Sequence, residues 1–164
     1  NTPSALTVGA IDMQGTARRS DDTIAPFSSK GPTRYDLVIK PDLVAPGTRL
    51  ASAEAAGSYL SRSFPDRHYA GSGSNAYIQL SGTSMAAGVV SGAAALLLDS
   101  NAKLTPRAAK AVLQLTSGPV AGAGLIAAGA GSVNALAAVA AVSSRRLVEF
   151  RIDGESPAVY GLTT

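Results

Sequence analysis

The chain of 164 residues contains no cysteine and no tryptophan, one histidine, and few charged residues (15%). Without cysteine there are no disulfides, no thiolate metal sites and no cysteine nucleophile. The net charge of +3 comes with no basic stripe and no interleaved aromatic residues, so a nucleic-acid partner is not expected. The hydrophobic share of 46% and the 17 glycines instead favour one globular domain with closely packed small residues.

Two uncharged stretches, 82–98 and 116–144, invite comparison with membrane spans. The longer one consists mostly of alanine and glycine, and Pro119 and several glycines interrupt it. Alanine and glycine provide little apolar area, so membrane insertion would be weakly driven. We expect tightly packed soluble structure and no membrane partner.

Ser84 lies where a predicted strand gives way to a predicted helix. The segment Tyr77 to Leu80 has the residue types of a short strand, and Val89 to Leu98 is an apolar run typical of a buried helix. At a helix start the first amides have no intrahelical acceptor and the dipole favours negative charge. A hydroxyl there can attack a carbonyl while its own N–H donates to the developing oxyanion. The alternative is that the serines and threonine here simply cap the helix.

The rest of the chain alternates strand and helix signals, which predicts an α/β fold with a parallel sheet and helices on both faces. Thr105 and Pro106 are typical of an N-cap and a first helical turn. The apolar residues expected on one face of that helix are Ala108, Ala111, Val112 and Leu115. The segment Ala53 to Asn75 is predicted to be an exposed excursion. Further strands are expected at Ala5 to Ile11, within Leu37 to Ala45 and at Leu147 to Ile152.

Three sequence motifs, in this order, resemble those of the subtilisin-like serine peptidases. They are Phe27 to Pro32 (FSSKGP), Lys40 to Gly47 (KPDLVAPG) and Gly82 to Ala86 (GTSMA). The resemblance implies that Ser84 is the nucleophile, with its backbone N–H as an oxyanion donor and Gly82, Thr83 and Met85 in support. It also implies that residues 1–144 are the C-terminal part of a catalytic domain whose fold is only half represented, and that 145–164 are a C-terminal strand and tail. By the same resemblance, Ser132 to Val142 would be the last helix of the domain.

The family's catalytic Asp, His and oxyanion Asn precede the nucleophile in the chain, and none of their motifs occurs here. Asn1 is not assigned the oxyanion role, because it precedes Pro3 in what resembles the next segment. Asp42 is expected to be a backbone acceptor rather than an acid catalyst. His68 is expected to be a solvated loop residue, and its recruitment as the base is retained as the alternative.

Three classes of function follow. The first is a serine endopeptidase that forms an acyl-enzyme on Ser84, with the Asp, His and Asn supplied by a segment outside this chain. The others are a catalytically incomplete fragment that serves as an assembly module, and a weak esterase that uses Ser84. The expected partners are a polypeptide substrate and either the N-terminal half of the catalytic domain or a second copy of this chain, which would cover faces at Val8, Val44 and Leu96.

The reaction requires no cofactor, and no metal site is assigned. Members of the family often bind structural calcium, but most ligands would lie in the other half of the domain. Asp21, Asp22 and Asp36 could form a weak cation site, although we prefer to interpret Asp21 and Asp22 as a solvated loop pair. The family resemblance also implies a secreted or extracellular location, with no signal in this chain.

Overall fold

The computed structural model describes residues 2–143 of the chain. Its main sheet has the strand order β2-β1-β3, formed by β1 (Val8–Asp12), β2 (Thr23–Ile24) and β3 (Leu43–Pro46). β1 and β3 are parallel, and their register runs from the pair Val8 and Leu43 to the pair Ile11 and Pro46. β2 pairs antiparallel with the end of β1. Both strands predicted in this part of the chain are present, although each is shorter than the sequence pattern.

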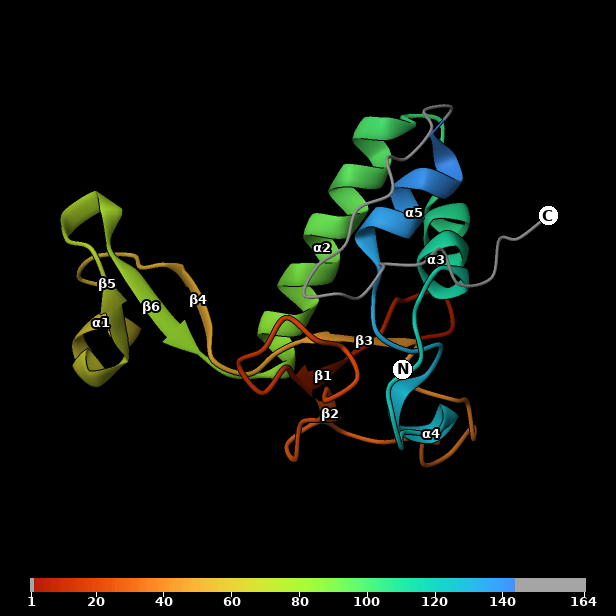
Figure 1. Ribbon diagram of the computed structural model, residues 1–164, viewed down its shortest axis with the longest axis horizontal. Coiled ribbons are helices and arrows are strands. Elements are labelled where there is room, and N and C mark those ends of the chain that lie inside the picture. Colours follow the sequence, from red (N-terminus) through yellow and green to blue (C-terminus); the bar gives the residue numbers. More distant parts are fainter. Residues whose placement is uncertain (1, 144–164) are drawn as a thin grey trace.

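Helices cover both faces of this sheet (Figure 1). On one side lie α2 (Thr83–Ser100), α3 (Pro106–Leu115) and α5 (Ala135–Val142), and on the other side lies the short α4 (Leu125–Ala128). The strand side chains alternate between two buried clusters. Ala10 and Leu43 contact the cluster of α2, α3 and α5, whereas Ile11 and Val44 pack with Val120 and Ala128 at α4. The predicted α/β fold with helices on both faces is confirmed.

A second three-stranded sheet projects from this body (Figure 1). Its strands are antiparallel in the order β4-β6-β5, with bounds β4 (Leu50–Ala53), β5 (His68–Ala70) and β6 (Tyr77–Leu80). Between β4 and β6 the chain also forms α1 (Tyr59–Ser63) and the 3₁₀ turns η1 (Pro65–Arg67) and η2 (Gly73–Asn75). The predicted exposed excursion is confirmed, but it is a folded hairpin with its own helix.

α2 begins earlier than the predicted apolar run and is buried on one face only. Its buried residues are Ala86, Val90, Ala93 and Leu97. The opposite face is open, with Leu96 53% exposed and Leu98 45% exposed. The expectation of a buried helix is therefore wrong for this exposed face of α2. Among residues 2–143, α2 is the helix long and apolar enough to span a membrane, a property that core helices of soluble proteins share.

α3 begins as predicted, because the Thr105 hydroxyl accepts a hydrogen bond from the Ala108 N–H and Pro106 occupies the first turn. Its buried face was predicted incorrectly: Ala109 and Leu113 are buried, whereas Leu115 is 71% exposed. α5 begins after the cap Asn134 rather than at Ser132. The predicted strand Leu147 to Ile152, and all of 145–164, lie outside the described residues.

A buried ion cluster around Asp42 fastens the N-terminal segment to β3 and α3. The Asp42 carboxylate accepts hydrogen bonds from the Thr7 N–H at 2.6 Å and Lys40 Nζ at 2.6 Å, and it pairs with Lys110 Nζ at 2.9 Å. Both lysines also donate to the Ala5 carbonyl oxygen. Burial by itself would raise the pKa of Asp42, but the bonds from Lys40, Thr7 and Lys110 outweigh it and lower that pKa. Asp42 is an acceptor as predicted, and two of its partners are buried or half-buried cations.

Replacing Asp42 should make the free energy of unfolding less dependent on pH in the acidic range. Since the folded-state pKa lies below the ordinary value of about 4, the carboxylate contributes fully above pH 5 and its contribution disappears as pH falls through the folded-state pKa. Asp42→Asn leaves Lys40 buried without its counter-ion and should lower the free energy of unfolding by about 3 kcal/mol at pH 7. Urea unfolding at pH 7 and pH 3 should show this difference shrinking in acid.

The matched control is Asp66→Asn, which breaks an exposed pair with Arg67 at 3.3 Å. Exposed pairs contribute little, so this variant should stay within about 0.5 kcal/mol of the parent at both pH values. Equal effects of the two substitutions would contradict the assignment of the Asp42 cluster.

Candidate active site

Ser84 is the second residue of α2, immediately after the turn that follows β6. The N-cap is Gly82, which has no side chain to accept from the first amides of the helix. Among residues 2–143, the N–H groups of Thr83 and Ser84 have no backbone acceptor, and the Ser84 hydroxyl has no hydrogen-bond partner. Ser84 is also exposed. An exposed hydroxyl therefore stands beside free amide donors at the positive end of an 18-residue helix.

The start of α2 is held against the end of β3 by a close backbone contact. The Gly82 N–H donates to the Gly47 carbonyl oxygen at 2.8 Å, and the Gly47 N–H donates to the Ile11 carbonyl oxygen at 3.0 Å. A Cβ at Gly47 would lie 2.6 Å from the Cβ of Ala10 and 3.0 Å from the Gly82 carbonyl oxygen. Only glycine fits here, so Gly47 sets how closely the helix that carries Ser84 approaches the sheet.

The three motifs singled out in the sequence meet beside this helix start. A cleft of about 370 Å³ is lined by Thr83, by Ser29 to Thr33, by Lys40 and Pro41, and by Thr7 to Gly9 of the β1 region. Ser28, in the first motif, is buried, and its hydroxyl accepts a hydrogen bond from the Ala10 N–H at 3.0 Å. Segments far apart in the chain thus converge on one side of the nucleophile candidate.

β1 has an open edge in this cleft. Backbone groups alternate along a strand, and the Thr7 carbonyl oxygen accepts from Asp42, on the β3 side. The Val8 N–H and C=O therefore point to the other edge, where β2 pairs only with Ile11 and Asp12. Within the described part of the chain, no backbone group pairs with Val8 on that edge.

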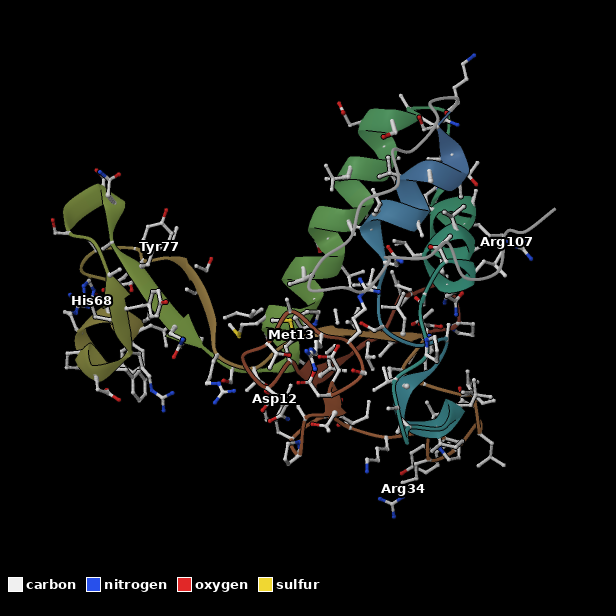
Figure 2. All side chains as sticks on the ribbon, in the orientation of Figure 1. Asp12, Met13, Arg34, His68, Tyr77 and Arg107 are labelled. Carbon is white, nitrogen blue, oxygen red and sulfur yellow. The ribbon has the colours of Figure 1, made fainter. Side chains whose placement is uncertain are left out.

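His68 is not brought near Ser84. It lies in β5, in the part of the projecting sheet away from α2 (Figure 2). Its Nδ1 is 2.8 Å from Glu54 Oε2, and Glu54 Oε1 accepts from the Ser61 hydroxyl at 2.5 Å. Hydrogen bonds from Ser61 and His68 lower the pKa of Glu54. The histidine therefore belongs to a cluster that joins β4, α1 and β5, which its position in the sequence did not indicate.

The three aspartates considered for a cation are engaged separately. Asp21 accepts from the Thr16 hydroxyl at 2.9 Å. Asp36 accepts from the Thr33 hydroxyl, which lowers the pKa of Asp36. Asp22 is buried, 5% exposed, so interpreting it as half of a solvated pair was wrong. Residues 2–143 contain no group of three or more carboxylate, histidine or cysteine side chains arranged to hold a metal ion.

Comparison with known proteins identifies the family. A model described as the subtilase family matches residues 1–146. The chain belongs to the subtilase family. This subtilase chain is 41% identical over 109 residues to the serine protease AprX of Bacillus subtilis (strain 168), covering 66% of the chain and 24% of AprX. It is 34% identical over 145 residues to the subtilisin-like protease SBT4.13 of Arabidopsis thaliana, covering 84% of the chain and 18% of the relative.

Two solved protease structures have a similar fold. Fervidolysin from Fervidobacterium pennivorans, a keratinolytic enzyme related to subtilisin, superposes with a TM-score of 0.62 at 27% identity, over 84% of this chain and 19% of its own. The CspB protease of Clostridium perfringens gives 0.63 at 25% identity, over 88% and 29%. The subtilase chain therefore spans less than a third of the length of each of these four proteins.

Gly47→Ala should displace the start of α2. The added methyl group would overlap Ala10, whose own Cβ is fixed to the backbone, so helix and sheet must separate. Overpacking of this kind lowers the free energy of unfolding by about 1–3 kcal/mol. We expect that loss in urea unfolding, together with a shift of the Gly82 and Ser84 amide resonances.

Gly88→Ala is the control, since an added Cβ at Gly88 meets nothing within 4 Å and the residue lies inside α2. Alanine favours the helix, so this variant of the chain should be stabilised by about 0.5–1 kcal/mol. If Gly47→Ala behaved like Gly88→Ala, the close contact would not position the helix.

Proposed function

We propose that the chain is the nucleophile-bearing part of a subtilase serine endopeptidase. Its family is that of serine peptidases, which supports this reaction class, and the observation that carries the assignment is the position of Ser84. Ser84 Oγ attacks the peptide carbonyl carbon while a base takes the hydroxyl proton. The Ser84 N–H donates to the oxyanion. The amine leaves with that proton, and water then hydrolyses the acyl-enzyme on Ser84.

The base, its orienting carboxylate and the second oxyanion donor are proposed to come from a segment outside this chain. Nothing in the described part places a histidine at Ser84, because the one histidine is bonded to Glu54 in the projecting sheet. The Asp42 carboxylate is likewise occupied by two lysines. A serine at this position therefore needs an imidazole from elsewhere to act as a nucleophile.

Two open surfaces next to Ser84 support the docking of such a segment. One is the β1 edge at Val8, and the other is the exposed face of α2 that includes Ser84 and Leu96. Exposed edges and apolar faces favour association. The expectation that Val44 would be exposed was wrong, because α4 and Val120 cover it completely. The same surfaces would serve an assembly module, which is the second candidate function.

The remaining expectations rest on the family resemblance. We propose that the reaction uses no cofactor, that the substrate is a polypeptide and that the enzyme acts outside the cell. A weak esterase activity of the chain by itself would require only the Ser84 hydroxyl and an activated ester, whose leaving group needs less help from an acid.

Ser84→Ala should abolish peptide hydrolysis by the complete enzyme. Members of a catalytic triad act as a unit, so the loss should reach several orders of magnitude in kcat. Hydrolysis of a quenched fluorescent peptide by the assembled enzyme measures it.

Two control variants separate catalysis from folding in the same assay. Ser91 lies about two turns further along α2, and its exposed hydroxyl donates to the Ala87 carbonyl oxygen. Ser91→Ala should retain activity within about threefold, since surface substitutions usually change stability by about 0.5 kcal/mol or less. His68→Ala removes the bond to Glu54 in the projecting sheet, away from Ser84, and should also retain activity within about threefold. Full activity of Ser84→Ala, or loss of activity in His68→Ala with the fold intact, would contradict the proposal.

The chain by itself should associate. If the β1 edge and the open face of α2 are docking surfaces, light scattering at micromolar concentration should show either a complex with the N-terminal catalytic segment or self-association. An interface of this kind should bury on the order of 2,000 Å² or more. A monomer that melts cooperatively and does not bind the segment would overturn this proposal.

A further inference from the structure

The segment Thr33 to Val38 forms a loop that is closed on itself by hydrogen bonds. The Thr33 N–H donates to the Val38 carbonyl oxygen at 3.0 Å, and the Val38 N–H donates to the Thr33 hydroxyl oxygen at 2.8 Å. Between these residues, Leu37 has a φ of 53°, in the left-handed region that a bulky side chain adopts only at an energetic cost. The loop therefore holds Leu37 in a preset conformation that asparagine or glycine would adopt with less strain.

This loop and α4 together expose large apolar side chains. Tyr35 is 91% exposed and Leu37 is 70% exposed. The loop lies beside α4, because the Gly31 N–H, just before it, donates to the Ile126 carbonyl oxygen at 2.9 Å (Figure 1). We call the exposed apolar residues of the two segments the α4 patch, which consists of Tyr35, Leu37, Ile39, Leu125 and Ile126.

The α4 patch has the area of the apolar part of one side of a dimer interface. Each of its five side chains is more than two-fifths exposed, so the patch presents on the order of 500 Å² of apolar surface, as much as the largest patch of a typical monomer. A standard interface buries about 800 Å² on each partner, and a little more than half of that area is apolar. The patch can therefore supply the apolar part of such an interface.

The charges next to Tyr35 are of both signs. Arg34 and Asp36 flank it in the chain and both are exposed, and Arg34 projects away from the body of the protein (Figure 2). The Arg34 guanidinium lies 5.8 Å from the centroid of the Tyr35 ring. The Thr33 hydroxyl donates to the Asp36 carboxylate and lowers the pKa of Asp36, which is therefore an anion at neutral pH.

This arrangement of charges is complementary to itself. In an isologous contact the same surface meets its copy across a two-fold axis, so Arg34 of each copy can face Asp36 of the other. A partner surface of a single charge sign would be attracted by one of these two groups and repelled by the other. The charges therefore favour a second copy of the chain as the occupant of the patch.

We propose that the α4 patch is the interface of a homodimer, in which two copies of the complete protein meet isologously. The patch contains no residue of α2, which lies on the other face of the main sheet, so the dimer leaves Ser84 outside the interface (Figure 1). The proposed interface is also separate from the β1 edge and from the open face of α2. The proposal therefore does not depend on the proposed function.

Sedimentation equilibrium of the complete protein tests the proposal, with Ser84→Ala present so that the sample does not digest itself. We expect a dimer whose Kd is micromolar or lower. Leu37→Asn should raise this Kd about tenfold or more, because it removes an exposed apolar side chain from the interface. The same substitution should not lower the thermal stability of the monomer, since asparagine adopts the left-handed region more readily than leucine.

Arg34→Asp tests the pairing of charges across the two-fold axis. Each copy of this variant carries negative charge at both positions 34 and 36, so the two copies should repel each other and the Kd should rise. The rise should become smaller at high salt, where charges on exposed groups are screened.

Leu115→Asn is the matched control, because Leu115 is 71% exposed in α3 and lies outside the α4 patch. It should leave the Kd of the dimer unchanged. Leu37→Asn in the chain by itself also distinguishes this contact from association through the β1 edge and the α2 face, which the substitution does not alter.

Three outcomes would overturn the proposal. The first is a complete protein that stays monomeric at high micromolar concentration. The second is a dimer whose Kd is the same in Leu37→Asn and Arg34→Asp as in the parent, because another surface would then join the copies. The third is a monomer that Leu37→Asn destabilises, which would show that another segment of the protein covers the patch. The mass does not depend on catalysis, so none of these outcomes affects the assignment of Ser84.

Discussion

The hydrogen bond from the Gly82 N–H to the Gly47 carbonyl oxygen determines where α2 begins, and the candidate site depends on it. It joins the end of the central strand β3 to the cap of the helix that carries Ser84. Because Gly82 contributes no side-chain oxygen, the amides behind it remain available for an oxyanion. The same short contact that fixes the helix therefore leaves its positive end open toward solvent, where a substrate carbonyl can approach.

Small residues make this approach of helix and sheet feasible. A Cβ at Gly9 would lie 2.9 Å from the buried Ser28 hydroxyl and 3.0 Å from Val44, and Gly47 is restricted as closely by Ala10 and Ala86. The low aromatic content of 5% and the many glycines of the sequence therefore correspond to close backbone contacts in the core. In such a core the backbones pack at short distance. A single methyl group added at Gly47 would therefore displace the start of α2, and Ser84 with it.

Local signals accounted for much of what the sequence predicted correctly. The strand Tyr77 to Leu80, the helix start at Ser84 and the Thr105 cap depend on neighbours within a few residues, and all three are present in the structure. The three motifs also identified the family, although no single local pattern shows that they share a cleft.

The errors have a common physical cause, since each depends on partners distant in sequence. α4 and Val120 bury Val44, and packing against α5 and α2 turns α3 toward Ala109 and Leu113. The hairpin strands β4 and β5 are short and exposed, and they exist because both pair with β6. In the same way, Glu54 of that hairpin engages the histidine, which no spacing rule links to it.

The most direct measurement of the central claim is covalent labelling of the complete enzyme with a phosphonylating reagent, followed by peptide mapping. Attack by an activated serine forms a stable phosphonyl ester on its oxygen. The account predicts one adduct per molecule, on the peptide that contains Ser84, and no adduct once the Gly47–Gly82 junction is disrupted by Gly47→Ala. An adduct on another residue with Ser84 unmodified would contradict it.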